Sequence, residues 1–134
     1  MRYMLDTDIC IYVINERPLA VLQAFRDHEA DGLGISSVSA AELFYGVART
    51  GSQRNLRALR QFLAPLEVAP FDRLAAEVCG SLRAWLASQG TPIGPYDTQI
   101  AAHAHSVGAT LVSNNTREFA RVPGLRVENW AESR

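Results

Sequence analysis

Short apolar runs alternate along the chain with longer segments in which apolar residues recur at helical spacing. Leu56, Leu59 and Leu63, for example, follow the i, i+3, i+7 pattern of one helix face. Runs such as Tyr3-Met4-Leu5 are too short for helices and are bounded by polar or turn-forming residues. Alternation of this kind predicts β-α repeats and a parallel sheet, which is an α/β fold.

The pattern places the expected elements from one end of the chain to the other. Strands are expected at 2–5, 33–36, 67–71, 110–113 and 126–130. Helices are expected at 7–14, from Pro18 onward, and at 38–48, 55–63, 74–88 and 96–107. Asp72 is expected to cap the helix at 74–88, and Gly108 to end the helix at 96–107. No repeat or linker divides the sequence, so a single domain spanning 1–134 is expected.

Composition limits the class of protein. The 134 residues are 48% hydrophobic and 20% charged, which is typical of a globular chain. No apolar run approaches the roughly 18 residues of a membrane span, and no signal-peptide pattern opens the chain, so we expect a cytoplasmic protein. Cys10 and Cys79 lie in apolar stretches without metal-binding spacing, which predicts buried thiols in a reducing compartment.

Charge gives mixed evidence about a nucleic-acid partner. The net charge of −1 offers no electrostatic support for one, but all 13 basic residues other than histidine are arginine. Arg49, Arg54, Arg57 and Arg60 crowd into one short stretch. They form either a solvated helix face or a surface that pairs with backbone phosphates.

Four polar side chains fall where strands end or helices begin: Asp6, Glu42, Asp97 and Asn115. Because the carboxyl ends of parallel strands share one edge of a sheet, residues this far apart in sequence can converge there. Three carboxylates gathered at one place repel each other and require a cation. Oxygen-only ligands favour Mg²⁺ or Mn²⁺ over zinc, so the pattern indicates a metal-dependent phosphodiesterase.

Each of these residues also has a purely structural explanation. Asp6 could cap the helix that follows it. Glu42 stands three residues after Ser39, which is the spacing of a capping box. Asp97 lies in the first turn of a helix, where its charge complements the helix dipole. Asn115 could belong to a simple cap and turn, and Asn114 competes with it for the site position.

Other candidates have weaker support. His103 and His105 are two residues apart on a helix, so they point to different faces and cannot share a metal as an i, i+4 pair would. With His28, they are expected to be structural or exposed. Tyr45 and Tyr96 could stack on bases, but packing inside the protein is the preferred interpretation.

Four stretches together resemble a PIN domain of the VapC toxin type. They occur in the family's order, cover essentially the whole chain, and read MLDTD at 4–8, SSVSAAELFYG at 36–46, TPIGPYDTQIAA at 91–102 and LVSNNTREF at 111–119. The resemblance implies a three-layer α/β/α sandwich around a central parallel sheet of about five strands. It also implies a Mg²⁺-dependent endoribonuclease that inhibits growth as the toxin of a type II toxin–antitoxin pair.

The resemblance also assigns roles. Asp6 and Asp97 match the principal Mg²⁺ ligands (Mn²⁺ being a substitute), and Glu42 matches the family's conserved glutamate, binding the ion directly or through water. Asn115 stands where relatives often have a fourth acid, which leaves the number of metal ions open. Implied partners are an RNA substrate (tRNA or mRNA), a VapB-like antitoxin, and a second copy within a toxin–antitoxin complex. No membrane is implied.

Two alternatives remain at this stage. Asp6-Thr7-Asp8 mimics the acid pair of a haloacid-dehalogenase-type phosphohydrolase, but that chemistry and that of a phospho-receiver module both expect a lysine, and the chain has none. The stronger alternative is a catalytically inert PIN-fold binding module. A stability shift on adding Mg²⁺ would separate it from the enzyme.

Overall fold

The computed structural model describes residues 1–132. Five strands lie in this part of the chain: β1 (Tyr3–Leu5), β2 (Leu33–Ser36), β3 (Glu67–Ala69), β4 (Thr110–Val112) and β5 (Val127–Glu128). Its helices are α1 (Thr7–Ile14), α2 (Leu19–Asp27), the 3-10 helix η1 (Glu29–Asp31), α3 (Ser37–Thr50), α4 (Gln53–Leu63), α5 (Arg73–Ser88), α6 (Pro95–Val107) and α7 (Thr116–Phe119). Residues 133–134 of the expected domain lie outside the described range.

The strands form one sheet in the order β3-β2-β1-β4-β5, and every neighbouring pair is parallel. The chain moves outward from β1 through β2 to β3, then crosses to β4 and β5 on the other side of β1. The winding direction therefore reverses between β1 and β4, which is where open α/β sheets bind ligands. The predicted α/β fold with about five parallel strands is confirmed.

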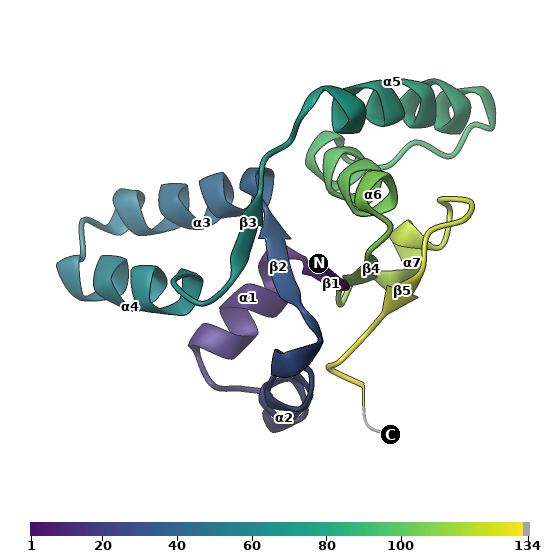
Figure 1. Cartoon of the computed structure of the whole chain (residues 1–134). Helices are drawn as coiled ribbons and strands as arrows, with labels where there is room; N and C mark the ends of the chain where they lie inside the picture. Colours follow the sequence, from purple (N-terminus) through teal and green to yellow (C-terminus); the bar gives the residue numbers. More distant parts are fainter. Residues whose placement is uncertain (133–134) are drawn as a thin grey trace.

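Helices cover both faces of the sheet, as the alternation of side chains along β1 requires. Tyr3 and Leu5 point into one core, which α1, α2, α3 and α4 help to fill. Met4 points into the other core, together with Ile100 and Ala104 of α6. Figure 1 shows α3 and α4 on one side of the strands and α5 and α6 on the other. The expected three-layer arrangement is confirmed.

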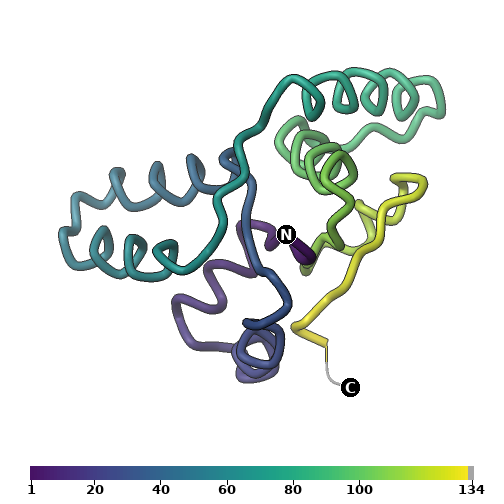
Figure 2. Tube along the Cα trace, in the orientation of Figure 1, coloured from purple at the N-terminus to yellow at the C-terminus, as the bar shows by residue number. Residues whose placement is uncertain are grey.

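The pairing of β2 with the edge strand β3 depends on one glycine. Gly34 in β2 pairs with Glu67 of β3, and a Cβ atom added at Gly34 would lie 2.7 Å from the Glu67 carbonyl oxygen. Such a contact is too close for any side chain, so the two backbones can approach only because this residue is glycine. Since β1 is the central strand, the N-terminus starts in the middle of the molecule (Figure 2).

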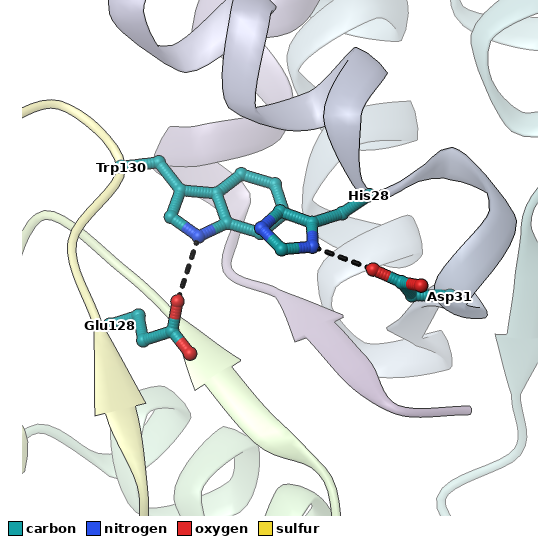
Figure 3. Close-up of polar contacts among 4 residues, drawn as sticks. All are labelled: His28, Asp31, Glu128 and Trp130. Atoms are coloured by element: carbon teal, nitrogen blue, oxygen red, sulfur yellow. Dashed lines mark hydrogen bonds and ion pairs between the residues drawn. The ribbon is translucent and has the colours of Figure 1, made fainter.

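The segment after β5 closes the first core. The Trp130 ring stacks on His28 at a centroid distance of 5.1 Å and an interplanar angle of 14°. Trp130 Nε1 donates a hydrogen bond to Glu128, and His28 pairs with Asp31 at 2.7 Å (Figure 3). His28 therefore has a structural role, as the sequence indicated.

The cap of α5, the two cysteines and the length of the helices bear on three further predictions. Asp72 Oδ1 accepts a hydrogen bond from Ala75 N–H, which confirms it as the cap of α5. Cys10 is buried and Cys79 is half-buried, and neither forms a disulfide. In residues 1–132, none of the helices has the length and apolar character needed to cross a membrane.

Candidate active site

Asp6 occupies the carboxyl end of β1, beside the end of β4. Its side chain is only 7% exposed. Thr7 N–H donates to Oδ1 at 2.8 Å, so Asp6 does cap α1, but Ser113 Oγ donates to Oδ2 at 2.8 Å from the end of β4. Burial is the main reason that the pKa of Asp6 is raised, and the negative charge of Glu118 adds to the effect. The residue thus holds a buried charge at the switch point of the sheet.

Asp8 ties the loop after β4 to the start of α1. Its carboxylate accepts hydrogen bonds from Ile9 N–H at 2.7 Å and from Asn114 N–H at 3.1 Å. Burial and the neighbouring charge of Asp6 raise the pKa of Asp8 to about 6. The Asn114 side chain forms its hydrogen bonds with Tyr12 and Asn129, neither of which is one of the four predicted site residues.

Glu42 does not form the capping box with Ser39 that was its structural explanation. Helix α3 is capped by Ser36, whose Oγ accepts from Val38 N–H at 3.1 Å, so Glu42 is in the second turn and cannot complete a capping box with Ser39. Burial and the charge of Asp6 raise the pKa of Glu42, and the nearby Thr7 side chain opposes this. Thr7 Oγ1 is buried and completes no hydrogen bond of normal geometry with a described residue.

Asp97 lies in the first turn of α6, after the N-cap Gly94. Burial, a hydrogen bond with the Glu118 carboxyl group and the charges of Glu118, Asp6 and Glu42 raise the pKa of Asp97 to about 7. Two carboxyl groups form a hydrogen bond only when they share a proton. The structure therefore places Asp97 within electrostatic range of both other predicted acids.

Glu118 is the residue that the sequence analysis missed. Gly94 N–H donates to its Oε1 at 2.8 Å, and Asn115 Nδ2 donates to its Oε2. Burial acts to raise the pKa of Glu118, but these hydrogen bonds and the one from Asp97 lower it overall. Asn115, the N-cap residue of α7, thus orients an acid three residues later, and this spacing between a cap and a glutamate was the available signal.

His103 fixes the helix that carries Asp97 against the helix that carries Glu42. It is buried, its Nδ1 lies 2.7 Å from Ser36 Oγ, and its ring meets the edge of Phe71. Burial lowers the pKa of His103, so the ring is neutral at pH 7. His105 is exposed, which agrees with the prediction that the two histidines face different ways.

The chemistry of this donor set fits a hard divalent cation. Asp6, Glu42 and Asp97 are linked by mutual repulsion, and no basic side chain of residues 1–132 lowers the pKa of any of them. Buried negative charge without compensation favours an oxygen-preferring metal ion. Within the same residues, no three His, Cys, Asp or Glu side chains lie close enough together to hold a metal ion as they stand. Because the pKa of Asp97 is raised to about 7, its ionised form, which is the form that binds a cation, predominates only above about neutral pH.

Four arginines lie outside this cluster. Arg49 near the end of α3 and Arg54, Arg57 and Arg60 on α4 are all exposed. They form a cationic surface that is solvated in the isolated chain, and it remains free to pair with phosphates or acidic partners.

The chain is similar to known proteins over nearly its full length. A family model described as PIN domain matches residues 3–125. The chain is 44% identical over 132 residues to the tRNA(fMet)-specific endonuclease VapC of Shigella flexneri, covering 98% of this chain and 99% of that protein. It is 45% identical over 131 residues to ribonuclease VapC2 of Haemophilus influenzae, covering 97% and 98%. In the crystal structure of DNA-bound VapBC from Salmonella typhimurium, a chain with 43% identity superposes with a TM-score of 0.89, covering 97% of this chain and 98% of that one.

Proposed function

Because this chain belongs to the PIN domain family, and within it to the VapC ribonuclease toxins, we propose that Asp6, Glu42, Asp97 and Glu118 form its hydrolytic centre. Asn115 then acts by holding Glu118. The observation that carries this assignment is the convergence of these acids on Asp97, whose pKa is raised mainly by burial and further by a hydrogen bond with Glu118 and by the charges of Glu118, Asp6 and Glu42.

PIN nucleases are typically metal-dependent, and the acids of this chain fit Mg²⁺, with Mn²⁺ as a substitute. Asp6 and Asp97 would be its principal ligands, and Glu42 would bind directly or through water. When bound, the ion would neutralise charge on the scissile phosphate and lower the pKa of the attacking water.

The remaining steps belong to side chains of the chain itself. Ser113 and the Thr7 N–H fix the Asp6 carboxylate in one orientation. Glu42 and Glu118 accept hydrogen bonds from the attacking water and direct it at the phosphorus. Because water attacks, and not the ribose 2′-hydroxyl, the products carry a 3′-hydroxyl and a 5′-phosphate.

We propose tRNA as the substrate, with initiator tRNA as the first candidate and mRNA as the runner-up. The support is the name of the Shigella flexneri relative, which is 44% identical over nearly the whole chain. Structured RNA also suits the exposed arginines, which can pair with the phosphates of a folded backbone.

We further propose that a VapB-like antitoxin covers the groove between α1, α3 and α4, in a complex that also contains a second copy of this chain. The groove has a volume of about 330 Å³ and an apolar wall that includes Ile11, Leu43 and Leu59. Its lining also includes Thr7 and Glu42, so a segment bound along it would reach the acids. The relative from Salmonella typhimurium is described as VapBC, a complex of this kind.

The test uses purified chain, initiator tRNA and Mg²⁺, with sequencing of the RNA ends. The intact chain should cleave, whereas Asp6→Asn and Asp97→Asn should lose at least about a hundredfold in rate, because each removes a charge that binds the ion. Chelation should abolish cleavage, and Mn²⁺ should restore it. Equal cleavage rates for the intact chain and both variants would contradict the assignment of Asp6 and Asp97 to the hydrolytic centre. No cleavage and no Mg²⁺-dependent stability shift would favour the inert binding module.

A further inference from the structure

A second groove adjoins the acid cluster on the side of α3 and α6. Its volume is about 700 Å³, and it is lined by Ser37, Val38, Ala41, Glu42, Tyr45 and Tyr96. Glu42 belongs both to this lining and to the cluster, so whatever occupies the groove lies directly beside the proposed scissile phosphate. The volume is within the roughly 300–1,000 Å³ of pockets that bind small organic groups.

Two tyrosines in this groove are exposed to solvent. Tyr45 is 67% exposed and Tyr96 is 60% exposed, so the expectation that they pack inside the protein is wrong. Tyr45 lies one turn after Glu42 on α3, and Tyr96 directly precedes Asp97 on α6. Both aromatic rings are therefore carried by the helices that carry the acids.

The remaining lining indicates the chemistry of the occupant. Val38 and Ala41 offer apolar contacts, and the guanidinium of Arg49 lies 5.7 Å from the centre of the Tyr45 ring. Apolar and aromatic surface suits a flat ring, and a nearby arginine suits a phosphate joined to it. A nucleotide of a single strand combines these two features.

We propose that Tyr45 and Tyr96 form a stacking site for one unpaired nucleobase of the RNA substrate, next to the bond that is cut, with Arg49 facing an adjoining phosphate. The inference rests on the proposed function and adds a binding site to it. Since every base presents an aromatic face, the site tolerates different bases but requires one that is not paired. Cleavage is therefore confined to loops and single strands.

The experiment measures RNA binding apart from cleavage. In an Asp6→Asn background, a short fluorescein-labelled single-stranded RNA is titrated and followed by anisotropy. Tyr45→Ala and Tyr96→Ala should each weaken binding by about fivefold to a hundredfold, which corresponds to the usual effect of losing one stacked base. Tyr45→Phe and Tyr96→Phe keep the ring and should bind as the parent does. Trp85→Ala is the matched control, because Trp85 is an exposed aromatic residue that lines a different groove, on α5.

A second measurement changes the RNA, so that its first comparison uses the native tyrosines and does not depend on how the variants fold. Abasic nucleotides are placed one at a time along the RNA. One position should weaken binding to the parent protein, and the same change should cost much less when Tyr45→Ala is present. If no abasic position matters, or if the alanine and phenylalanine variants bind alike, the stacking site is refuted.

Light scattering on the same variants tests the competing occupant, a second copy of this chain. If the alanine variants lose dimer mass while their affinity for RNA is unchanged, the tyrosines form a protein contact and the inference is wrong. These results differ from a failure of the proposed function, in which the intact chain would neither bind nor cleave RNA.

Discussion

Asp97 and Glu118 are both carboxyl groups on helices, yet their surroundings shift their pKa values in opposite directions. Glu118 receives hydrogen bonds from the Gly94 N–H and from Asn115, and these stabilise its ionised form. Asp97 has no such donors and is surrounded by negative charge, so it retains a proton up to about neutral pH. Ionisation of Asp97, the form that binds a cation, is therefore shifted toward neutral pH, whereas Glu118 ionises more readily.

Glu118→Gln tests the role of this acid at the residue scale. The variant keeps the size of the side chain but removes its charge, so RNA cleavage should fall by at least about a hundredfold. Asn115→Ala should lose roughly tenfold to a hundredfold, since it only releases Glu118 from its orientation. Steady-state cleavage with Mg²⁺ is the measurement.

Asn114→Ala is the matched control for Asn115→Ala. Asn114 is exposed, and its side chain contacts Tyr12 and Asn129 on the far side of the loop. Its activity should remain close to that of the intact chain. If Asn114→Ala were as impaired in cleavage as Asn115→Ala, activity would depend on the conformation of the whole loop and not on the hydrogen bond from Asn115 to Glu118.

Single residues were predictable where they follow a strand. Asp6 ends a short apolar run, and its place at the edge of a parallel sheet follows from that fact alone. Glu118 was not predictable in the same way, because α7 is one turn long and shows no apolar periodicity. Apart from its spacing from Asn115, its role becomes visible only when α7 lies against Gly94, a contact between residues 24 positions apart.

At the scale of elements, the start of α3 has a double function. Ser36 Oγ caps the helix by accepting from Val38 N–H, and it also lies 2.7 Å from the buried His103. The cap thus sets where α3 begins and fixes its distance from α6. Because these two helices carry Glu42 and Asp97, one hydroxyl group aligns two of the proposed acids.

Ser36→Ala should therefore destabilise the protein by more than an ordinary lost cap. Loss of a cap costs about 1 kcal/mol, and the unpaired buried His103 nitrogen adds about 1–3 kcal/mol. Ser52→Ala at the exposed cap of α4 is the comparison, and about 1 kcal/mol is expected there. Urea unfolding of both variants gives the two values. If the two costs are equal, the His103 contact contributes nothing.

The sequence predicted most elements because local signals set their ends. Helix α1 and strand β2 occur at the predicted residues, and α5 differs only at its first residue. The predicted strands at 67–71 and 126–130 were too long, since the observed β3 and β5 end where their partner strands end. Strand length at the two edges of a sheet depends on pairing, and pairing is not visible in a single segment.

For the whole molecule, the acid cluster links folding stability to pH. The pKa of Asp97 is raised to about 7 and that of Asp8 to about 6, while both lie near 4 in the unfolded chain. Between about pH 4 and pH 7 these two groups therefore bind more protons in the folded chain than in the unfolded chain. Their contribution to the free energy of unfolding decreases as the pH rises through this window.

In the presence of a chelator, the melting temperature should accordingly be a few degrees lower at pH 7.5 than at pH 5. Solvent screening keeps the effect modest, because Asp97 is only half-buried. Asp97→Asn should flatten the pH dependence. Millimolar Mg²⁺ should raise the melting temperature at pH 7.5 much more than at pH 5, because binding needs the ionised acids. A melting temperature that rises with pH under chelation would contradict this account.

The two residues that meet at the ends of β1 and β4 are synthesised at very different times. The hydroxyl of Ser113 that holds Asp6 is added 107 residues after it, so an unfinished polypeptide has the first acid but not its anchor. A nascent chain therefore cannot complete the proposed hydrolytic centre before Ser113 has been added.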